Sequence, residues 1–439
     1  MAGSFQWLTL STAISQLGQR LNITPSTTSF WTEAELQTYI GTALRQFNSL
    51  CWMWRQDYNY NSTNLWNSLG LLSGSPRKRT LYDTDAYTEM EYMLLEPPSG
   101  GTWTGTNQFS ISTLSQALQR RRDEIIQITN CNQVLSAGIP LVPNTIRTVL
   151  SDNTIDVERV RYIPVSGDPT TLYRDDTVAQ EFYEAPLYQQ NPGTPTTFSL
   201  SSEPPLSFQV DIPPSQPGTY EAVVLQSGAP FNPPTPTLVG IPNDFVYVLE
   251  YGALADLLGQ ESEATDRERS AYCLQRYQDG LQLMLKTPWI ELGKVNGQAV
   301  SIDSIVATDR YSPEWDSNPT GFGPVIVAGG MDFIAAPVGS NIGCTVLGSA
   351  PVPVNPTDYV QVSRSDWEIV ILLAQCRCLF KMGGQEWKSG LELEKSAIQM
   401  CASNNVRLKS MGAFSDVLDQ RGGQQERDSN RYNTANKGK

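Results

Sequence analysis

The sequence has 439 residues, of which 40% are hydrophobic and 17% charged, so it is long enough for about two to four globular domains. Its formal net charge of −14 argues against electrostatic binding to nucleic acid or an anionic membrane, although it would suit a surface over which DNA slides without sticking. The chain contains no histidine, which excludes Ser-His and Cys-His nucleophilic catalysis and every metal site built on histidine.

The seven cysteines are odd in number, widely spread and mostly set among apolar neighbours. We therefore expect reduced core residues of a protein made in the cytosol, and for Cys376 and Cys378 we prefer this interpretation to a metal-binding pair. The N-terminus lacks the basic and apolar regions of a signal peptide, and no stretch reaches the ~18 consecutive apolar residues of a membrane helix.

Two amphipathic helices are predicted near the N-terminus. The first ends before Pro25. The second begins with a capping box of Thr32 and Glu35, and its apolar face is marked by periodic residues. These are Leu36, Ile40, Ala43, Leu44, Phe47, Leu50 and Trp54.

Residues 58–80 are rich in Tyr, Asn, Ser and Gly and predict a long surface loop. A short helix over 85–95 and a longer amphipathic helix from Ile111 to Ile128 follow. The longer helix carries Arg120, Arg121 and Arg122 in its middle. We interpret these arginines as a solvated helix face, with phosphate or partner contact as the alternative.

From 131 to 241 the apolar period changes from helical to alternating. Residues 207–212 and 220–224 each place apolar side chains at every second position, with PPSQPG between them, which predicts a hairpin with one dry face. The dense prolines that surround it are typical of a small antiparallel sheet or sandwich with long loops.

The stretch 242–290 predicts a helical hairpin at the centre of the fold. We expect Asn243 to cap the first helix, Gly259 to close it in a left-handed conformation, and Thr265 with Glu268 to start the second as a capping box. The first helix is apolar nearly all round. The apolar stripe of the second consists of Ala271, Leu274, Tyr277, Leu281 and Met284.

This hairpin cannot stand alone. Burial of about ten such side chains returns roughly 15–30 kcal/mol, whereas fixing about 40 backbones costs roughly 1–2 kcal/mol each. Other helices, from the same chain or from a neighbouring subunit, must therefore cover it. Our working hypothesis is that identical neighbours complete these helices around a central hole.

Short strands return over 291–362, with Asn296-Gly297 as a hairpin turn, and helices return with a capping box of Ser365 and Glu368. The expected fold class is thus α+β, a helical body interrupted by two β-rich insertions and followed by a polar extended tail. The expected parts are N-terminal helices (1–57), a loop-rich insertion with a helix (58–130), a β-rich insertion (131–241), the central hairpin (242–290), a second β-rich segment (291–362), C-terminal helices (363–420) and a tail (421–439).

Several segments together resemble large virion structural proteins of tailed bacteriophages, and within that group head-to-tail adaptor (connector) proteins. These segments are MLLEPPSGGTWTGTNQFSISTLSQALQRRRDEI (93–125), VERVRYIPVSGDPTTLYRDD (157–176), EAPLYQQNPGTPTTFSL (184–200), the hairpin at 242–287 and DWEIVILLAQCRCLFKMGGQEW (366–387). The likeness covers most of the chain but consists of diffuse patterns without a chemical signature.

The resemblance implies a homo-oligomeric ring, twelvefold in the better known relatives, clamped beneath the portal protein. Viral double-stranded DNA would pass through its lumen without sequence-specific binding. The tail would dock into the portal through Arg421, Arg427, Arg431 and Tyr432, and the β-rich insertions would face tail, nozzle or fibre proteins. The protein would assemble in the bacterial cytoplasm, reside in the virion neck, and be neither an enzyme nor a cofactor-binding protein.

Three alternatives remain open. One is another neck, tail or fibre-anchoring virion protein. A second is a carboxylate-dependent glycan hydrolase, for which Asp83 with Asp85, or Asp175 with Asp176, are the available pairs. A third is a sugar-binding module that uses the aromatic residues of the 58–80 loop, Tyr58, Tyr60 and Trp66.

Overall fold

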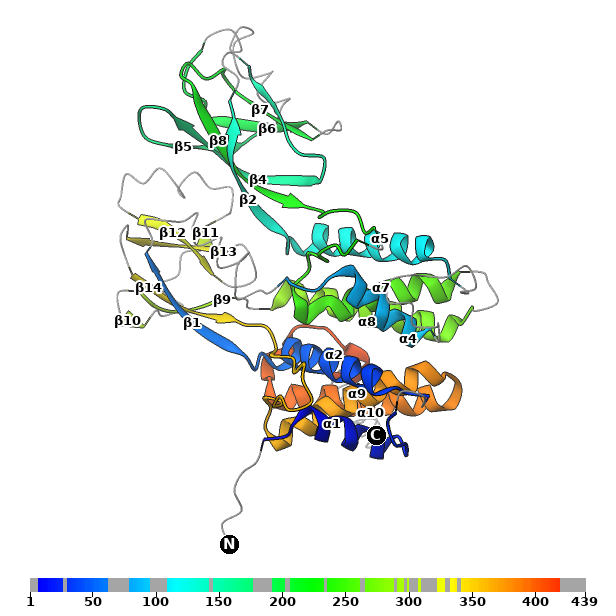
Figure 1. Cartoon of the computed structure of the whole chain (residues 1–439). Helices are drawn as coiled ribbons and strands as arrows, with labels where there is room; N and C mark the ends of the chain where they lie inside the picture. The colour runs from blue at the N-terminus through cyan, green and yellow to red at the C-terminus, as the bar shows by residue number, and fades with distance from the viewer. Residues whose placement is uncertain are drawn as a thin grey trace, which may run out of the picture.

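The computed structural model describes residues 7–26, 30–61, 79–94, 109–141, 145–176, 192–201, 206–232, 235–260, 265–287, 290–295, 298–299, 307–308, 322–327, 332–337 and 341–418. Within these residues the chain forms a helical body and β-rich parts beside it, so the α+β class is confirmed (Figure 1).

The helical body is assembled from segments that lie far apart in the sequence. Its helices are α1 (Leu10–Arg20), α2 (Glu33–Cys51), α4 (Asp83–Met93), α5 (Ile111–Thr129), α7 (Val246–Gly259), α8 (Arg267–Lys286), α9 (Arg364–Met382), α10 (Gly384–Asn404) and α11 (Ser415–Leu418), with 3₁₀ turns η2 (Asn243–Phe245) and η5 (Val406–Ser410). Figure 1 shows α5 on one side, then α7 and α8 with α4, then α2, and α9, α10 and α1 on the other side. The predicted hairpins α7/α8 and α9/α10 are both present.

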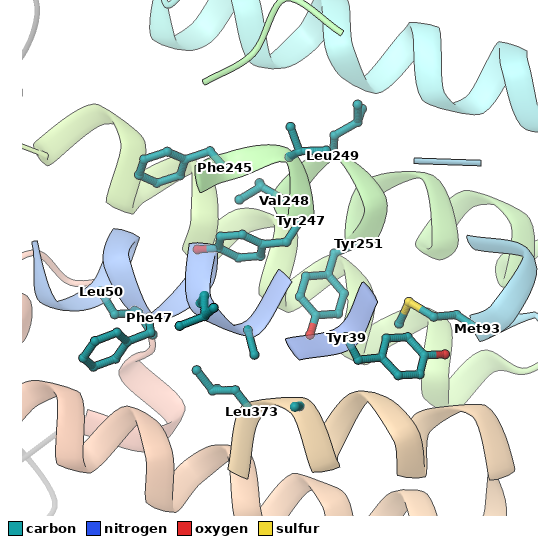
Figure 2. Close-up of a cluster of buried hydrophobic side chains, with 14 of the residues drawn as sticks. Tyr39, Phe47, Leu50, Met93, Phe245, Tyr247, Val248, Leu249, Tyr251 and Leu373 are labelled. Carbon is teal, nitrogen blue, oxygen red and sulfur yellow. The ribbon is translucent and has the colours of Figure 1, made fainter. Parts of the chain in front are cut away.

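Helix α7 lies at the centre of this body. All of its residues except Asp256 and Gly259 are buried. Figure 2 shows Tyr247 and Tyr251 projecting from α7 toward α2, where Phe47 and Leu50 lie. The chain's own helices therefore supply the cover that the apolar sequence of α7 demands. Of the two sources of cover that the sequence left open, the same chain supplies that of α7. Completion of the other helices by neighbouring copies stays a prediction.

Close approach explains two glycines of the central hairpin. A Cβ atom on Gly280 of α8 would lie 2.5 Å from Cγ2 of Val248, and a Cβ atom on Gly252 of α7 would lie 2.8 Å from the Tyr277 ring. Side chains at these positions would separate the two helices. The glycines thus permit the tight packing of α7 against α8.

The ends of the central helices differ from the predictions. Asn243 accepts from the backbone N–H groups of Thr80 (2.9 Å) and Leu81 (3.3 Å), and so ties the chain before α4 to the turn before α7 instead of capping α7. Gly259 is the last residue of α7 and is not left-handed; its Cβ would lie 2.9 Å from the Ser270 hydroxyl, so close packing is the reason for glycine there.

Three predicted capping boxes were also only partly right. Helix α8 is capped by Asp266 and not by Thr265, and α9 is capped by Ser363, two residues before the predicted Ser365. Thr32 caps α2 as predicted, but the carboxylate of Glu35 binds Lys381. Several Ser, Thr and Asp residues compete at each of these starts, and backbone geometry selects among them.

The 131–241 region forms one seven-stranded sheet. Its strands are β2 (Gln133–Pro140), β3 (Arg147–Val149), β4 (Thr154–Pro164), β5 (Thr170–Arg174), β6 (Thr197–Ser201), β7 (Ser207–Val210) and β8 (Gly218–Gln226), in the order β2-β8-β4-β5-β6-β7-β3. Neighbours are antiparallel except β5 and β6. The predicted β7/β8 hairpin was wrong, because β8 pairs with β2 and β4 while β7 pairs with β6 and β3.

The sheet curls so that both predicted strands still share one dry face. The rings of Phe208 in β7 and Tyr220 in β8 lie 5.1 Å apart edge to face, although four positions separate their strands in the sheet order. The predicted dry face was partly right. Phe208, Val210, Tyr220, Ala222 and Val224 are buried and Ile212 is half-buried, but Ser207, Asp211 and Val223 of the opposite face are buried as well.

The second β-rich part draws on two distant segments. Strands β1 (Arg55–Asn61), β14 (Asn341–Leu347), β9 (Ile290–Val295) and β10 (Gln298–Ala299) form one sheet, and β11 (Ala307–Thr308), β13 (Asp332–Pro337) and β12 (Phe322–Val327) another. Residues 58–61, predicted as loop, belong to β1 and pair with β14. The predicted hairpin around 296–297 is confirmed by the pairing of Val295 with Gln298.

Candidate functional site

The arginine cluster of α5 faces three different environments. Arg121 holds Asp256 of α7 through two hydrogen bonds, from Nε at 2.9 Å and from Nη2 at 2.6 Å, and its Nη1 donates to Glu124 at 2.8 Å. Its guanidinium also lies 4.8 Å from the centre of the Tyr277 ring. Arg120 pairs with the same Asp256, but its side chain is 64% exposed.

Arg122 is fully buried. Its Nη1 donates to the carbonyl of Ala229 at 2.7 Å, its Nε donates to Asp123 at 3.1 Å, and its guanidinium lies 4.3 Å from the centre of the Phe231 ring. Burial lowers the pKa of Arg122 from its ordinary value. The solvated face that we expected was thus wrong for Arg121 and Arg122, which tie α5 to α7 and to the segment after β8. Phosphate or partner contact remains a prediction, for which Arg120 offers the most surface.

A buried ion cluster lies where α2, α4, α7 and α9 meet. Arg377 of α9 donates from Nη1 to Glu89 of α4 at 2.6 Å and to Glu250 of α7 at 3.5 Å. The hydroxyl of Thr42 in α2 donates to the other oxygen of Glu89 at 2.5 Å. Burial first, and then the Glu89 charge, raise the pKa of Glu250 well above its ordinary value. The cluster links four helices. A helix that moved out of the body would leave the polar groups of the others without their partners.

A second buried cluster joins α8, α10 and the C-terminal segment. Arg276 contacts three carboxylates, those of Asp279, Glu394 and Asp416. Our predicted apolar stripe of α8 missed this side, since Arg276 and Asp279 are buried whereas Ala271 and Leu274 are exposed. The sequence did carry a signal for these buried charges. Single charged residues stand beside residues that helical spacing places in the core, such as Arg276 beside Tyr277 and Arg377 beside Cys378.

The β-rich parts leave the helical body at one end. Chain segments run from α2 to β1, from α5 to β2 and from α8 to β9, and Figure 1 shows these exits on the same side of the body. At the root of the β1/β14 pair, the Asn48 side chain donates to the carbonyl of Gly348 at 2.8 Å and accepts from the N–H of Trp54 at 3.1 Å. One side chain thus holds the residue before β1 and the residue after β14.

Asp244 completes this root. It is buried and accepts from the backbone N–H of Ala350 at 3.0 Å. Burial raises the pKa of Asp244 to about 6, against the opposing effects of the Ala350 N–H and the Arg45 charge. Asn48 and Asp244 together fix how β1 and β14 enter the helical body.

The candidate catalytic pairs have structural roles or lie in the open. Asp83 is buried and accepts from the N–H groups of Thr84 and Thr237, both at 2.9 Å. Asp85 accepts from the N–H of Tyr82 at the start of α4. Asp175 and Asp176 are exposed at the end of β5. These positions give the hydrolase alternative no support.

The expectation of reduced cysteines is confirmed for the described side chains. Cys131, Cys273, Cys376, Cys378 and Cys401 are buried and form no disulfide, and the half-buried Cys51 forms none either. In the part of the chain that the structure describes, no group of three or more Cys, Asp or Glu is placed to hold a metal ion. No helix among the described residues is long and apolar enough to cross a membrane.

Some predicted site residues fall outside the described residues. These are the tail positions Arg421, Arg427, Arg431 and Tyr432, as well as Trp66 and the side chains of Tyr58 and Tyr60.

Comparison of the sequence with protein-family models and with curated proteins finds no match.

Proposed function

We propose that this chain is a structural protein of a tailed bacteriophage virion, a head-to-tail adaptor that forms a ring beneath the portal and continues the DNA channel toward the tail. The observation that carries the proposal is the layout of the chain. The β-rich parts all leave the helical body at one end (Figure 1). A separate packed segment, Val406–Leu418, precedes the C-terminal tail. This division into a packed helical body and separate β-rich parts supports a role in joining different assemblies.

A ring needs a surface on which copies meet, and the buried α7 does not offer one. The outer face of α8 is our candidate. Its exposed residues between the charged ends of the helix are Ala271, Leu274, Gln275, Gln278, Gln282 and Leu285, and none of them is charged. Depletion of charge is the compositional mark of an interface core. Copies of a chain with a net charge of −14 repel one another, so they are expected to meet where local charge is absent.

The acidic composition also suits the proposed channel. A lumen lined by a chain of net charge −14 repels the DNA backbone and disfavours stable binding to phosphates.

The mass of the purified protein, alone and mixed with purified portal rings, tests the proposal. Native mass spectrometry and negative-stain images should show a closed ring in at least one of the two samples. The double substitution Leu274→Glu and Gln278→Glu should reduce ring formation at least tenfold, whereas Gln399→Glu on the exposed face of α10 should leave it unchanged. A strictly monomeric chain that does not bind portal rings would contradict the proposal.

A second position in the virion is favoured by the presence of separate β-rich parts at one end of the body. Such parts suit a neck, tail or fibre-anchoring protein equally well. Localisation of the chain in a density map of the particle separates the two positions. An adaptor lies directly beneath the portal, and a fibre anchor lies at the periphery.

A further inference from the structure

The chain after α10 is packed onto the helical body without forming a long helix of its own. Residues 405–418 comprise the turn η5, a loop and the short α11. Leu408, Met411, Ala413 and Phe414 of this segment are buried. Phe414 has a φ of +55°, a conformation that a bulky side chain adopts only where its surroundings hold it. The segment is thus held in one defined path.

Arg276 and Asp279 of α8 hold residues 405–418 in this path by hydrogen bonds and an ion pair, which together are called the polar grip. Arg276 donates from Nη2 to Asp416 at 2.6 Å and from Nη1 to the other Asp416 oxygen at 3.2 Å. Asp279 accepts from the N–H of Phe414 at 2.8 Å, and the guanidinium of Arg276 lies 5.4 Å from the Phe414 ring centre. Lys286 at the end of α8 donates to the carbonyl of Met411 at 2.5 Å.

Stability of the body alone does not account for this grip. Arg276 already has two buried carboxylates as partners, Asp279 at 2.6 Å and Glu394 at 3.1 Å, which more than balance its charge. Asp416 is a third carboxylate, 42% exposed, and comes from the last described turn of the chain. A third carboxylate on one guanidinium adds little to the packing of α8 against α10, but it fixes where α11 ends.

The residues that follow have a different charge from the body. Residues 419–439 carry five Lys and Arg against three Asp and Glu, a net charge of +2, so that residues 1–418 carry −16. A basic segment is attracted to an acidic body, so the point from which it leaves the body determines which acidic surfaces it can reach.

We infer that Arg276 is a positioning residue: with Asp279 it clasps residues 405–418 onto α8 and α10 and fixes the point from which the basic C-terminal tail leaves the acidic body. The tail then reaches an acidic surface of a protein partner. This last step rests on the proposed function, in which that partner is the portal.

Hydrogen exchange of the full-length protein, followed by mass spectrometry, tests the clasp. Asp416→Asn removes the charge but keeps the shape, and Arg276→Lys keeps the charge but loses the two-point grip. Both variants should speed exchange in residues 411–418 about tenfold or more while α7 and α9 exchange as before. Glu368→Gln is the matched control, because Glu368 is 44% exposed and also pairs with an arginine, Arg20 at 2.6 Å.

Two exchange results would overturn the clasp: residues 411–418 that already exchange like an unstructured peptide in the unaltered protein, or a change of less than twofold in both variants. Binding to purified portal rings supplies the positioning readout. Asp416→Asn should weaken binding about as much as removal of residues 419–439. If removal weakens binding and Asp416→Asn does not, Arg276 does not position the tail. If removal has no effect, the proposed docking fails, and the exchange data still decide the clasp.

Discussion

Glu89 of α4 and Glu250 of α7 share one buried guanidinium, that of Arg377, which donates to the first at 2.6 Å and to the second at 3.5 Å. Two carboxylates around one cation cannot both be ionised without cost in a buried site. The shorter bond and the additional donor Thr42 make Glu89 the closer partner of Arg377. Glu250, whose pKa burial and the Glu89 charge raise, is the member that keeps its proton most readily.

This asymmetry predicts opposite outcomes for two isosteric substitutions. Glu89→Gln leaves Arg377 without its close partner and should destabilise the fold by about 3 kcal/mol, as expected for a broken buried ion pair. Glu250→Gln should leave stability at neutral pH unchanged or raise it. Urea unfolding of both variants at pH 7 measures the difference.

The pH dependence of the free energy of unfolding tests the role of Glu250 independently. A raised pKa means that the folded protein binds the Glu250 proton more tightly than the unfolded chain, so this contribution is fully present below about pH 4.5 and is lost as pH rises through the folded pKa. Glu250→Gln should therefore flatten the loss of stability with rising pH. Equal slopes for the variant and the unaltered protein would show that Glu250 does not carry it.

The raised pKa of the buried Asp244 predicts a second effect of pH on stability, over a narrower pH range. Because burial raises its pKa from 3.8 to about 6, stability should fall by up to about 3 kcal/mol between pH 4 and pH 6. Asp244→Asn still accepts from the Ala350 N–H through its amide oxygen and cannot ionise, so its stability should fall less over this window than that of the unaltered protein, by up to about 3 kcal/mol. Denaturant unfolding of both proteins at pH 4, 5 and 6 makes the comparison, and an equal change of stability in the two would contradict it.

The apolar patterns of the sequence predicted helices and buried faces well, because periodicity reports directly on burial. The whole of α7, the stripe of α2 and the start and end of α5 follow from it. The buried charges did not follow. Arg122, Arg276 and Arg377 look like surface residues to any rule that counts charge as solvated. Apolar neighbours in the sequence hint that Arg276 and Arg377 are buried, but the fold is needed to show that each arginine has a carboxylate or carbonyl within hydrogen-bond distance.

Strand pairing was the other failure, and it has a physical reason. Alternation in 207–212 and 220–224 fixes which side chains face the core but says nothing about which strand lies alongside. In the curled sheet Phe208 and Tyr220 meet across the core instead of along a shared ladder. The strand β1 escaped notice because RQDYNYN lacks an apolar alternation.

The arginine cluster of α5 predicts a graded response. Arg122→Met removes the donor to Ala229 and the partner of Asp123 from a buried position and should destabilise the fold by about 2–4 kcal/mol. Arg120→Gln should change stability by less than about 0.5 kcal/mol, because an exposed ion pair contributes little. Thermal unfolding of the two variants tests the order, and equal losses would show that exposure does not separate them.

Packing between α7 and α8 predicts the last effect. A methyl group on Gly280 would lie 2.5 Å and 2.7 Å from the two methyl carbons of Val248, whose β-branched side chain has little freedom to turn away. Gly280→Ala should therefore destabilise the fold by about 1–3 kcal/mol, although alanine favours a helix more than glycine does. Val248→Ala in the same chain should recover part of this loss, since it removes the methyl groups that clash. The recovery, measured as a double-mutant cycle in urea, distinguishes the contact from a general weakness of α8: independent, additive losses would contradict close packing at this pair.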